Sequence, residues 1–263
     1  MTTLSFLPHP SISQYVSDIV VIENNHVYRE AILPLIAKGY PSITFQVTDT
    51  DQLSDPQKKV DNLVLYGQNI KPIELATVGY VTVIAYFLYP YMLKPLFGFD
   101  AKEVTDMGID VSLSQPARGM SIKEQLINTP SLTRRLELMN EYLLKLIERS
   151  YPGVNNTILS ATQSIQKSKG LLSLTAAQKE LHVTERTLQR LFESHIGVSP
   201  KMFSRICQFS SALQQLHQNQ FSGMPGIAYE NGYADQSHFI RAFKEFTHYS
   251  PLEYLRLANA FPR

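Results

Sequence analysis

Two short clusters of side chains that can hydrogen-bond to the edges of DNA bases recur in the C-terminal half of the chain. The first cluster consists of Arg186, Gln189 and Arg190, and the second of Gln236, Ser237 and Arg241. Arginine pairs bidentately with guanine, glutamine with adenine and serine with either, so these residue types suit direct reading of base edges in the major groove. Arg190 and Arg241 stand 51 residues apart, which indicates that one cluster is a copy of the other.

Each cluster is expected on the exposed face of a helix whose opposite face is buried. The buried face repeats at i, i+3, i+4 and i+7. Its members are Leu188, Leu191, Phe192 and His195 in the first copy and Phe239, Ala242, Phe243 and Phe246 in the second. Thr184 and Asp235 stand at equivalent places before these helices and are good N-caps. Short helices predicted at 174–181 and 224–230 precede them, so each copy predicts a helix-turn-helix whose second helix enters the major groove.

Two longer segments contain the copies: LTAAQKELHVTERTLQRLFESHIGVSPKMFSRI and IAYENGYADQSHFIRAFKEFTHYSPLEYLRL. They resemble the two helix-turn-helix subdomains of the AraC/XylS family of bacterial transcription regulators, and the resemblance covers roughly residues 155–257. The family's signature spacing is present in the second segment at Ile227-Ala228, Gly232-Tyr233, Phe239, Arg241, Phe243-Lys244 and Ser250-Pro251. Two residues depart from the family pattern. His248 replaces the usual Gly, and Gln208 stands where an Arg is common.

The resemblance implies an all-α DNA-binding domain, expected at 154–263, with double-stranded DNA and RNA polymerase as partners. Its two recognition helices would enter successive major grooves about 34 Å apart on one face of the duplex. Lys201 and Lys244 are the expected phosphate contacts, and Lys179, Arg205 and Arg256 are further candidates. Solvated surface charge is the competing explanation for about half of these five. Residues 151–263 carry 11 Lys/Arg and 7 Asp/Glu, net +4, whereas residues 1–150 carry 13 and 16, net −3.

The first half, expected as a domain at 1–150, has the pattern of a β-rich barrel or sandwich. The predicted strands, separated by Pro, Gly and Asp/Asn, are Val16–Ile22, Ala31–Leu35, Ser42–Val47 and Asn62–Tyr66. The uncharged run from Leu75 to Leu93 is long enough to span a membrane, but its β-branched and aromatic residues favour buried strands. The whole chain is therefore predicted to be α+β, with no membrane segment.

This half loosely resembles the cupin-like sensor domains of the family, which implies a small-molecule effector. Five aromatic residues could line an effector pocket or simply form the core: Tyr40, Phe45, Tyr66, Tyr86 and Phe87. Only His9 and His26 occur here, far apart, so we expect no metal site and no cofactor. We identify no catalytic motif and predict that the protein is not an enzyme. Two alternatives remain: a cupin-type enzyme with a DNA-binding tail, and a regulator controlled by a protein partner.

A helix is predicted to open at Thr129-Pro130, and its apolar stripe has coiled-coil spacing. The stripe consists of Leu132, Leu136, Met139, Leu143 and Leu146. It predicts either the seam of a homodimer or a face packed on the helix's own domain. Residues 150–153 form the expected linker. The N-terminus lacks the pattern of a secretory signal, and the one cysteine, Cys207, is expected to be a small core residue, so we predict a cytoplasmic protein.

Overall fold

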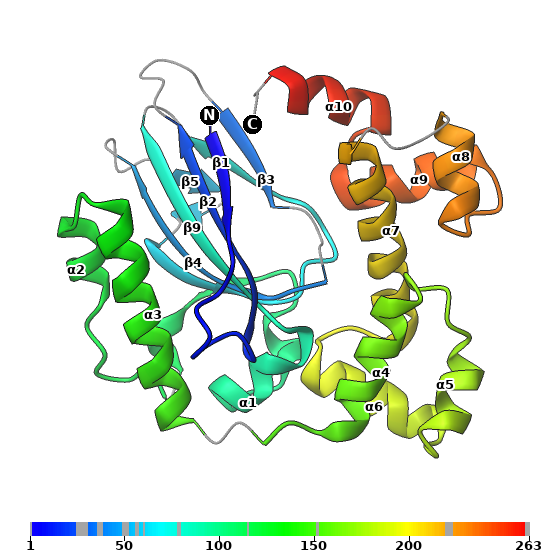
Figure 1. Cartoon of the computed structure of the whole chain (residues 1–263), viewed down its shortest axis with the longest axis horizontal. Helices are drawn as coiled ribbons and strands as arrows, with labels where there is room; N and C mark the ends of the chain where they lie inside the picture. The colour runs from blue at the N-terminus through cyan, green and yellow to red at the C-terminus, as the bar shows by residue number, and fades with distance from the viewer. Residues whose placement is uncertain are drawn as a thin grey trace.

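The computed structural model describes residues 2–24, 31–35, 39–48, 53–55, 58–59, 61–77, 80–114, 116–150, 153–218 and 223–260 of the chain. Within these residues, two antiparallel sheets and three α-helices occupy the N-terminal half, and seven α-helices the C-terminal half (Figure 1). The predicted α+β class, a β-rich half followed by an all-α half, is confirmed. His26 and residues 151–152 of the expected linker lie outside the described residues.

The larger sheet has six antiparallel strands. In spatial order they are β1 (Thr2–Phe6), β2 (Val16–Asn24), β9 (Val81–Leu88), β4 (Ser42–Thr48), β7 (Leu63–Tyr66) and β10 (Gly108–Asp110). The smaller sheet has the order β3 (Ala31–Leu35), β8 (Ile73–Thr77), β5 (Leu53–Asp55) and β6 (Lys58–Lys59). Most of the uncharged run forms β9 and part of β8, as its composition predicts, whereas its last residues, 90–93, are helical. No described helix is long and apolar enough to cross a membrane.

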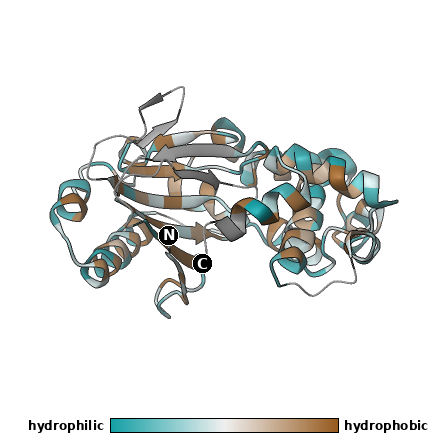
Figure 2. Ribbon diagram, turned by 90° about the horizontal axis from the view of Figure 1, so that it is seen from above, coloured by the Kyte–Doolittle hydropathy of each residue, from teal (hydrophilic) through white to brown (hydrophobic). Residues whose placement is uncertain are grey.

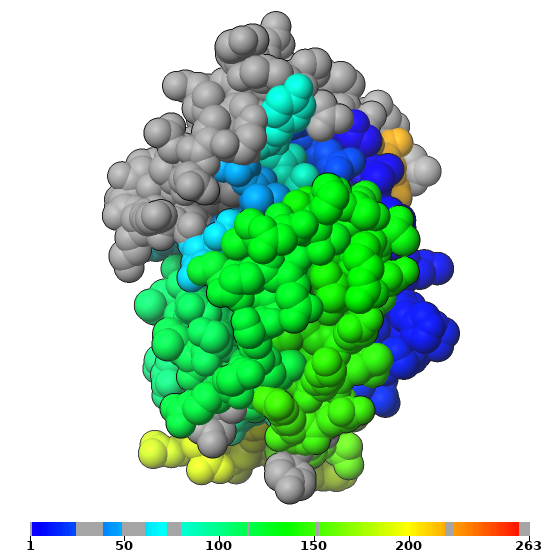
Figure 3. Space-filling model, turned by 90° about the vertical axis from the view of Figure 1, so that its left-hand side faces the viewer, coloured from blue at the N-terminus to red at the C-terminus, as the bar shows by residue number. Residues whose placement is uncertain are grey.

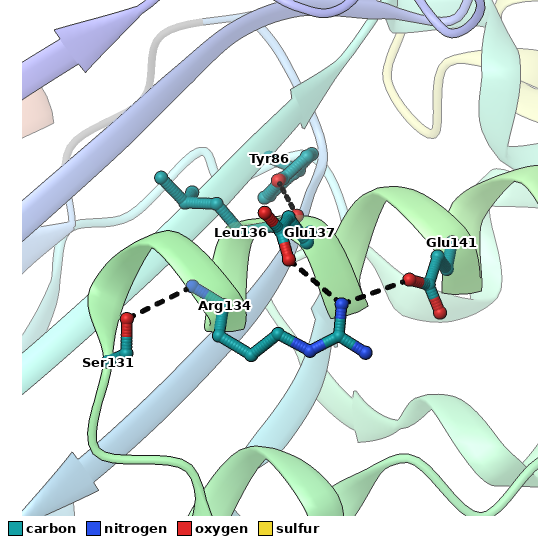
Figure 4. Close-up of polar contacts among 6 residues, drawn as sticks. All are labelled: Tyr86, Ser131, Arg134, Leu136, Glu137 and Glu141. Carbon is teal, nitrogen blue, oxygen red and sulfur yellow. Dashed lines mark hydrogen bonds and ion pairs between the residues drawn. The ribbon is translucent and has the colours of Figure 1, made fainter.

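Helices α2 (Lys123–Asn128) and α3 (Leu132–Arg149) cover one face of the larger sheet (Figures 1 and 3). Ile43 of β4 pairs with Tyr86 of β9, so both side chains lie on the same face. The Tyr86 hydroxyl donates to the Leu136 carbonyl oxygen at 3.1 Å (Figure 4), and the Arg135 guanidinium lies 5.3 Å from the Phe45 ring centroid. Phe45 and Tyr86 are therefore core residues beneath α3.

The apolar stripe of α3 packs on its own domain. Met139, Leu143 and Leu146 are fully buried, and Leu132 and Leu136 pack against the same core. The interpretation of this stripe as a dimer seam is therefore wrong, because its central residues already fill the space between helix and sheet. The outward face of α3 is charged instead. There the Arg134 guanidinium contacts Glu137 at 2.8 Å and Glu141 at 3.3 Å (Figure 4).

Among the described residues, four short helical turns lie between β9 and α2; the first three contact the second half of the chain, and the fourth contacts β7 of the larger sheet. They are η1 (Pro90–Met92), α1 (Leu93–Phe97), η2 (Ala101–Val104) and η3 (Val111–Leu113). The C-terminal helices are α4 (Asn156–Lys167), α5 (Leu174–Glu180), α6 (Glu185–His195), α7 (Pro200–Gln218), α8 (Met224–Glu230), α9 (Gln236–Thr247) and α10 (Pro251–Ala260). Figure 2 shows apolar residues gathered on the strands and polar residues on the outer faces of the helices.

Candidate nucleic-acid interface

The first helix-turn-helix consists of α5 and α6. Thr184 caps α6, since its hydroxyl accepts a hydrogen bond from the Thr187 backbone N–H at 3.2 Å. Leu188 and Phe192 face the core and are fully buried. Arg186 and Arg190 are exposed on the opposite side of α6, where the periodicity predicts them. The exposed face of α6 can therefore present two guanidinium groups to a ligand.

Gln189, the third residue of this cluster, is half-buried and already engaged. Its side-chain amide donates to Glu193 Oε1 at 2.7 Å. Glu193 Oε2 in turn lies 3.2 Å from the Lys102 ammonium, which belongs to η2 of the N-terminal half. The pKa of Glu193 is held below its usual value, first by the Gln189 hydrogen bond and then by Lys102. Because the Gln189 amide has two N–H donors and an acceptor oxygen, this one bond orients the side chain without using all of its hydrogen-bonding groups.

The second helix-turn-helix consists of α8 and α9. Asp235 caps α9 by accepting a hydrogen bond from the His238 backbone N–H at 2.7 Å. Gln236, Ser237 and Arg241 are all exposed, on the first two turns of the helix. The opposite face is fully buried, and its large members are Phe239, Phe243 and Phe246. The arrangement repeats that of α6, as the internal duplication predicts.

His238 is a candidate that the sequence reasoning missed. It is exposed on the first turn of α9, and its ring packs edge-on against Tyr233 at a centroid distance of 5.4 Å. Its place in the sequence could have indicated it. His238 is the third residue after the N-cap Asp235, in the first turn of the helix, where backbone N–H groups lack partners within the helix. His238 widens the surface that α9 offers.

Helix α7 holds the two units in one fixed arrangement. The Phe203 ring packs on Phe192 of α6 at 5.7 Å, and the Phe209 ring stacks on Phe246 of α9 at 4.8 Å. Arg205 of α7 forms a 2.5 Å ion pair with Glu245, and its guanidinium lies 5.6 Å from the Phe246 ring centroid. Arg205, a predicted phosphate contact, therefore also joins α7 to α9.

Both departures from the family pattern are accommodated. The Gln208 side-chain amide donates to the Asn231 carbonyl oxygen at 2.8 Å, so this position still links α7 to the end of α8. His248 adopts a left-handed backbone, with φ of 64°, and its N–H donates to the Lys244 carbonyl oxygen at 2.8 Å. A histidine thus occupies the left-handed position at the C-terminus of α9 where glycine is usual. The predicted phosphate contacts Lys201 and Lys244 are both exposed.

The C-terminal end of α6 rests on the N-terminal half. Thr105 Oγ1 donates to the Gly197 carbonyl oxygen at 2.8 Å, and a side chain on Gly197 would collide with Ala101. Ser194 Oγ donates to Asp100 Oδ1 at 2.6 Å, and Lys94 contacts both side chains. The Lys94 and Ser194 hydrogen bonds hold the pKa of Asp100 below its usual range. The two halves therefore share a polar and closely packed contact that no local sequence pattern indicates.

The described residues contain no group of three or more His, Cys, Asp or Glu side chains arranged to hold a metal ion. His9 is exposed, and its Nδ1 lies 2.8 Å from Ser11 Oγ. Cys207 is a buried residue of α7, and burial raises the pKa of its thiol to about 12. The predicted role of Cys207 as a core residue is consistent with this placement.

Comparison with known proteins gives matches in both halves. Residues 178–257 match a family described as a helix-turn-helix domain, and residues 4–110 match a domain of unknown function. An uncharacterized HTH-type transcriptional regulator of Haemophilus influenzae is 40% identical over 65 residues, which are 25% of this chain and 22% of that protein. The C-terminal half is therefore similar to helix-turn-helix domains of transcriptional regulators. The chain aligns with only about a fifth of the length of that relative.

Solved structures resemble the fold over nearly its whole length. ToxT from Vibrio cholerae has a TM-score of 0.52 at 12% identity, covering 91% of this chain and 97% of ToxT. A structure of ToxT bound to (E)-4-(8-methylnaphthalen-1-yl)but-3-enoic acid has the same TM-score and identity and covers 98% of this chain and 99% of ToxT. At this identity the likeness establishes a shared fold for both halves.

Proposed function

We propose that this protein is a sequence-specific DNA-binding regulator of transcription that inserts α6 and α9 into successive major grooves. The observation that carries the proposal is the pair of clusters on two equivalent helices, in which every residue except Gln189 is exposed, with both helices fixed to α7. Arg190 and Arg241 are the principal base-reading residues. The remaining base contacts come from Arg186, Gln189, Gln236 and Ser237. A fixed spacing matters because it makes the two helices read one composite site.

Lys201 and Lys244 are proposed to contact phosphates next to the recognition helices. Both are exposed, and Lys244 lies on α9, one turn after Arg241. Contacts of this kind set the register of the protein on DNA without reading sequence. The DNA-binding domain is proposed to span 154–263 and a regulatory domain 1–150, with RNA polymerase as the partner of the DNA-bound protein in the cytoplasm.

The N-terminal half is proposed to bind a small-molecule effector or to mediate dimerisation. The contact of η2 with α6 supports a regulatory role, because it joins the two halves beside Gln189. The structural likeness to ToxT bound to an organic acid gives a second reason to expect an effector. With the α3 stripe buried in the core, a homodimer would have to use another surface.

Selection of bound fragments from random double-stranded DNA, followed by affinity measurements, tests the proposal. Arg190→Ala and Arg241→Ala should each weaken specific binding by about 1–3 kcal/mol and relax the preference at one base pair. Arg118→Ala is the matched control, since Arg118 is an exposed arginine of the N-terminal half. Specific affinity that is unchanged in both variants would remove these arginines from the readout.

A further inference from the structure

A pocket of about 310 Å³ lies where the N-terminal half meets α4 and α7. Tyr40, just before β4, forms the wall contributed by the sheet domain. The opposite wall comes from the end of α4 and the middle of α7, and includes Gln166, Lys167, Lys169, Ser210 and Ser211. Its volume falls at the lower end of the range for small-molecule sites. The pocket lies against helices, outside the space between the two sheets.

The pocket is built by a specific docking of the sheet domain on α7. Gly39 has a left-handed backbone, with φ of 81°, and a side chain there would contact Ile206 and Phe203 at 3.6 and 3.7 Å. The next residue, Tyr40, accepts a hydrogen bond from the Gln166 side-chain amide at 3.0 Å. The turn before β4 therefore lies on α7, with Tyr40 lining the pocket.

The charged side chains that line the pocket are two lysines, and the carboxylate of Asp18, outside the lining, acts on Tyr40 from the sheet domain. Lys167 and Lys169 are exposed at the end of α4, and none of the described residues that line the pocket is an Asp or Glu. Lys167 is in the last turn of the helix, where a cation also interacts favourably with the helix dipole. Lys169 lies beyond that turn, so the dipole accounts for it less well. Two lysines without a carboxylate among the lining residues favour an anion.

The neutral groups of the pocket add hydrogen-bond donors. The Tyr40 oxygen accepts the bond from Gln166. Within the described residues its hydroxyl hydrogen is not used in that bond, so the hydroxyl can donate to a ligand. Burial raises the pKa of Tyr40, so the hydroxyl stays protonated at neutral pH. The hydroxyls of Ser210 and Ser211 lie on the same wall. This set matches a ligand that carries several negatively charged or strongly polar oxygens.

We propose that this pocket binds a small organic anion, a carboxylate or a phosphate ester, held by Lys167, Lys169 and the Tyr40 hydroxyl. Such a ligand contacts both halves of the chain at once. It therefore stabilises the arrangement in which the turn at Gly39 and Tyr40 rests on α7, because a ligand favours the state in which its contacts are complete. The inference does not depend on DNA binding by the protein.

The test uses the full-length protein and two probes, malonate and inorganic phosphate, at constant ionic strength adjusted with chloride. We expect at least one probe to raise the thermal unfolding temperature in a saturable way, since it binds the folded state only. The double variant Lys167→Gln/Lys169→Gln should need a probe concentration at least about tenfold higher for the same rise in unfolding temperature. Tyr40→Phe should show a smaller loss, and Lys71→Gln, at an exposed lysine outside the pocket, should match the wild type.

Two results would overturn the proposal. One is the absence of a saturable rise with both probes. The other is an equal rise in the double variant, confirmed as folded by circular dichroism, which would indicate a general salt effect. DNA affinity of the double variant is measured in parallel. A loss of DNA affinity and of its salt dependence, without any effect of the probes, would assign the lysines to DNA phosphates and likewise refute a small-molecule site.

Discussion

Replacing Phe209 by Ala should loosen the second helix-turn-helix from α7 and weaken DNA binding through that unit. Phe209 is fully buried, and its ring centroid lies 4.8 Å from that of Phe246 and 5.3 Å from that of Phe243. Truncation of a buried Phe costs about 3–5 kcal/mol through lost burial and the cavity that remains. Each of the two ring contacts contributes about 0.5–1.5 kcal/mol beyond the buried area, which places this variant toward the upper end of that range.

Urea unfolding followed by circular dichroism measures the loss. A loss of this size is a large share of the roughly 5–15 kcal/mol by which a domain is stable, so the midpoint should fall clearly. Tyr229→Ala is the matched control, because Tyr229 is an aromatic residue of α8 that is 85% exposed. The control should change stability by no more than about 0.5 kcal/mol.

The functional readout is a footprint on a composite site. With α9 no longer anchored, protection of the half-site read by α9 should weaken before that of the half-site read by α6. A stability loss below about 1 kcal/mol would refute the reasoning that Phe209 fixes α9 to α7. Equal weakening at both half-sites would show instead that the two units do not depend on α7 separately.

Four further variants test other contacts. Leu143→Asp places an unpaired carboxylate in the core of the sheet domain, so that domain should lose its circular dichroism signal, whereas a soluble folded monomer would restore the dimer-seam interpretation. Gln208→Ala removes the donor to the Asn231 carbonyl oxygen and should lower the stability by about 1–3 kcal/mol in urea unfolding; no change would show that water replaces the bond. Lys102→Met removes the ion pair with Glu193, and limited proteolysis should then cut between the halves faster than in the wild type. Burial lowers the pKa of His195 from 6.5, so its unfolded form binds a proton first and stability should fall as the pH drops below about 6.5; His195→Gln should flatten that part of the profile.

The helix-turn-helix units could be predicted from the sequence because their determinants are local. The i, i+3, i+4 repeat around Leu188 and Phe239 and the caps at Thr184 and Asp235 each act within one or two turns. The structure places all four as expected. The internal duplication added a second, independent reading of the same pattern. Local sequence therefore identified the exposed clusters, although their contact with DNA stays a prediction.

The contacts between the halves could not be predicted in this way. Lys102 and Glu193, or Thr105 and Gly197, are about ninety residues apart, and no periodicity connects them. The hydrogen bond from Gln189 to Glu193 depends on the side-chain rotamers of both residues. Lys102 of η2 helps to fix the rotamer of Glu193 through their ion pair. The stripe of α3 shows the same limit, since an a/d repeat fits a sheet of the same chain as well as a second helix.

The most direct test of the central claim is the base preference of Arg190→Ala and Arg241→Ala, measured by selection from random duplexes at fixed salt. If α6 and α9 read successive major grooves, each variant relaxes one base pair, and the two relaxed positions lie about 10–10.5 base pairs apart. The wild type and Arg118→Ala should share one unrelaxed profile. Uniform weakening across all sequences in both arginine variants, or relaxed positions without this one-turn separation, would contradict the account.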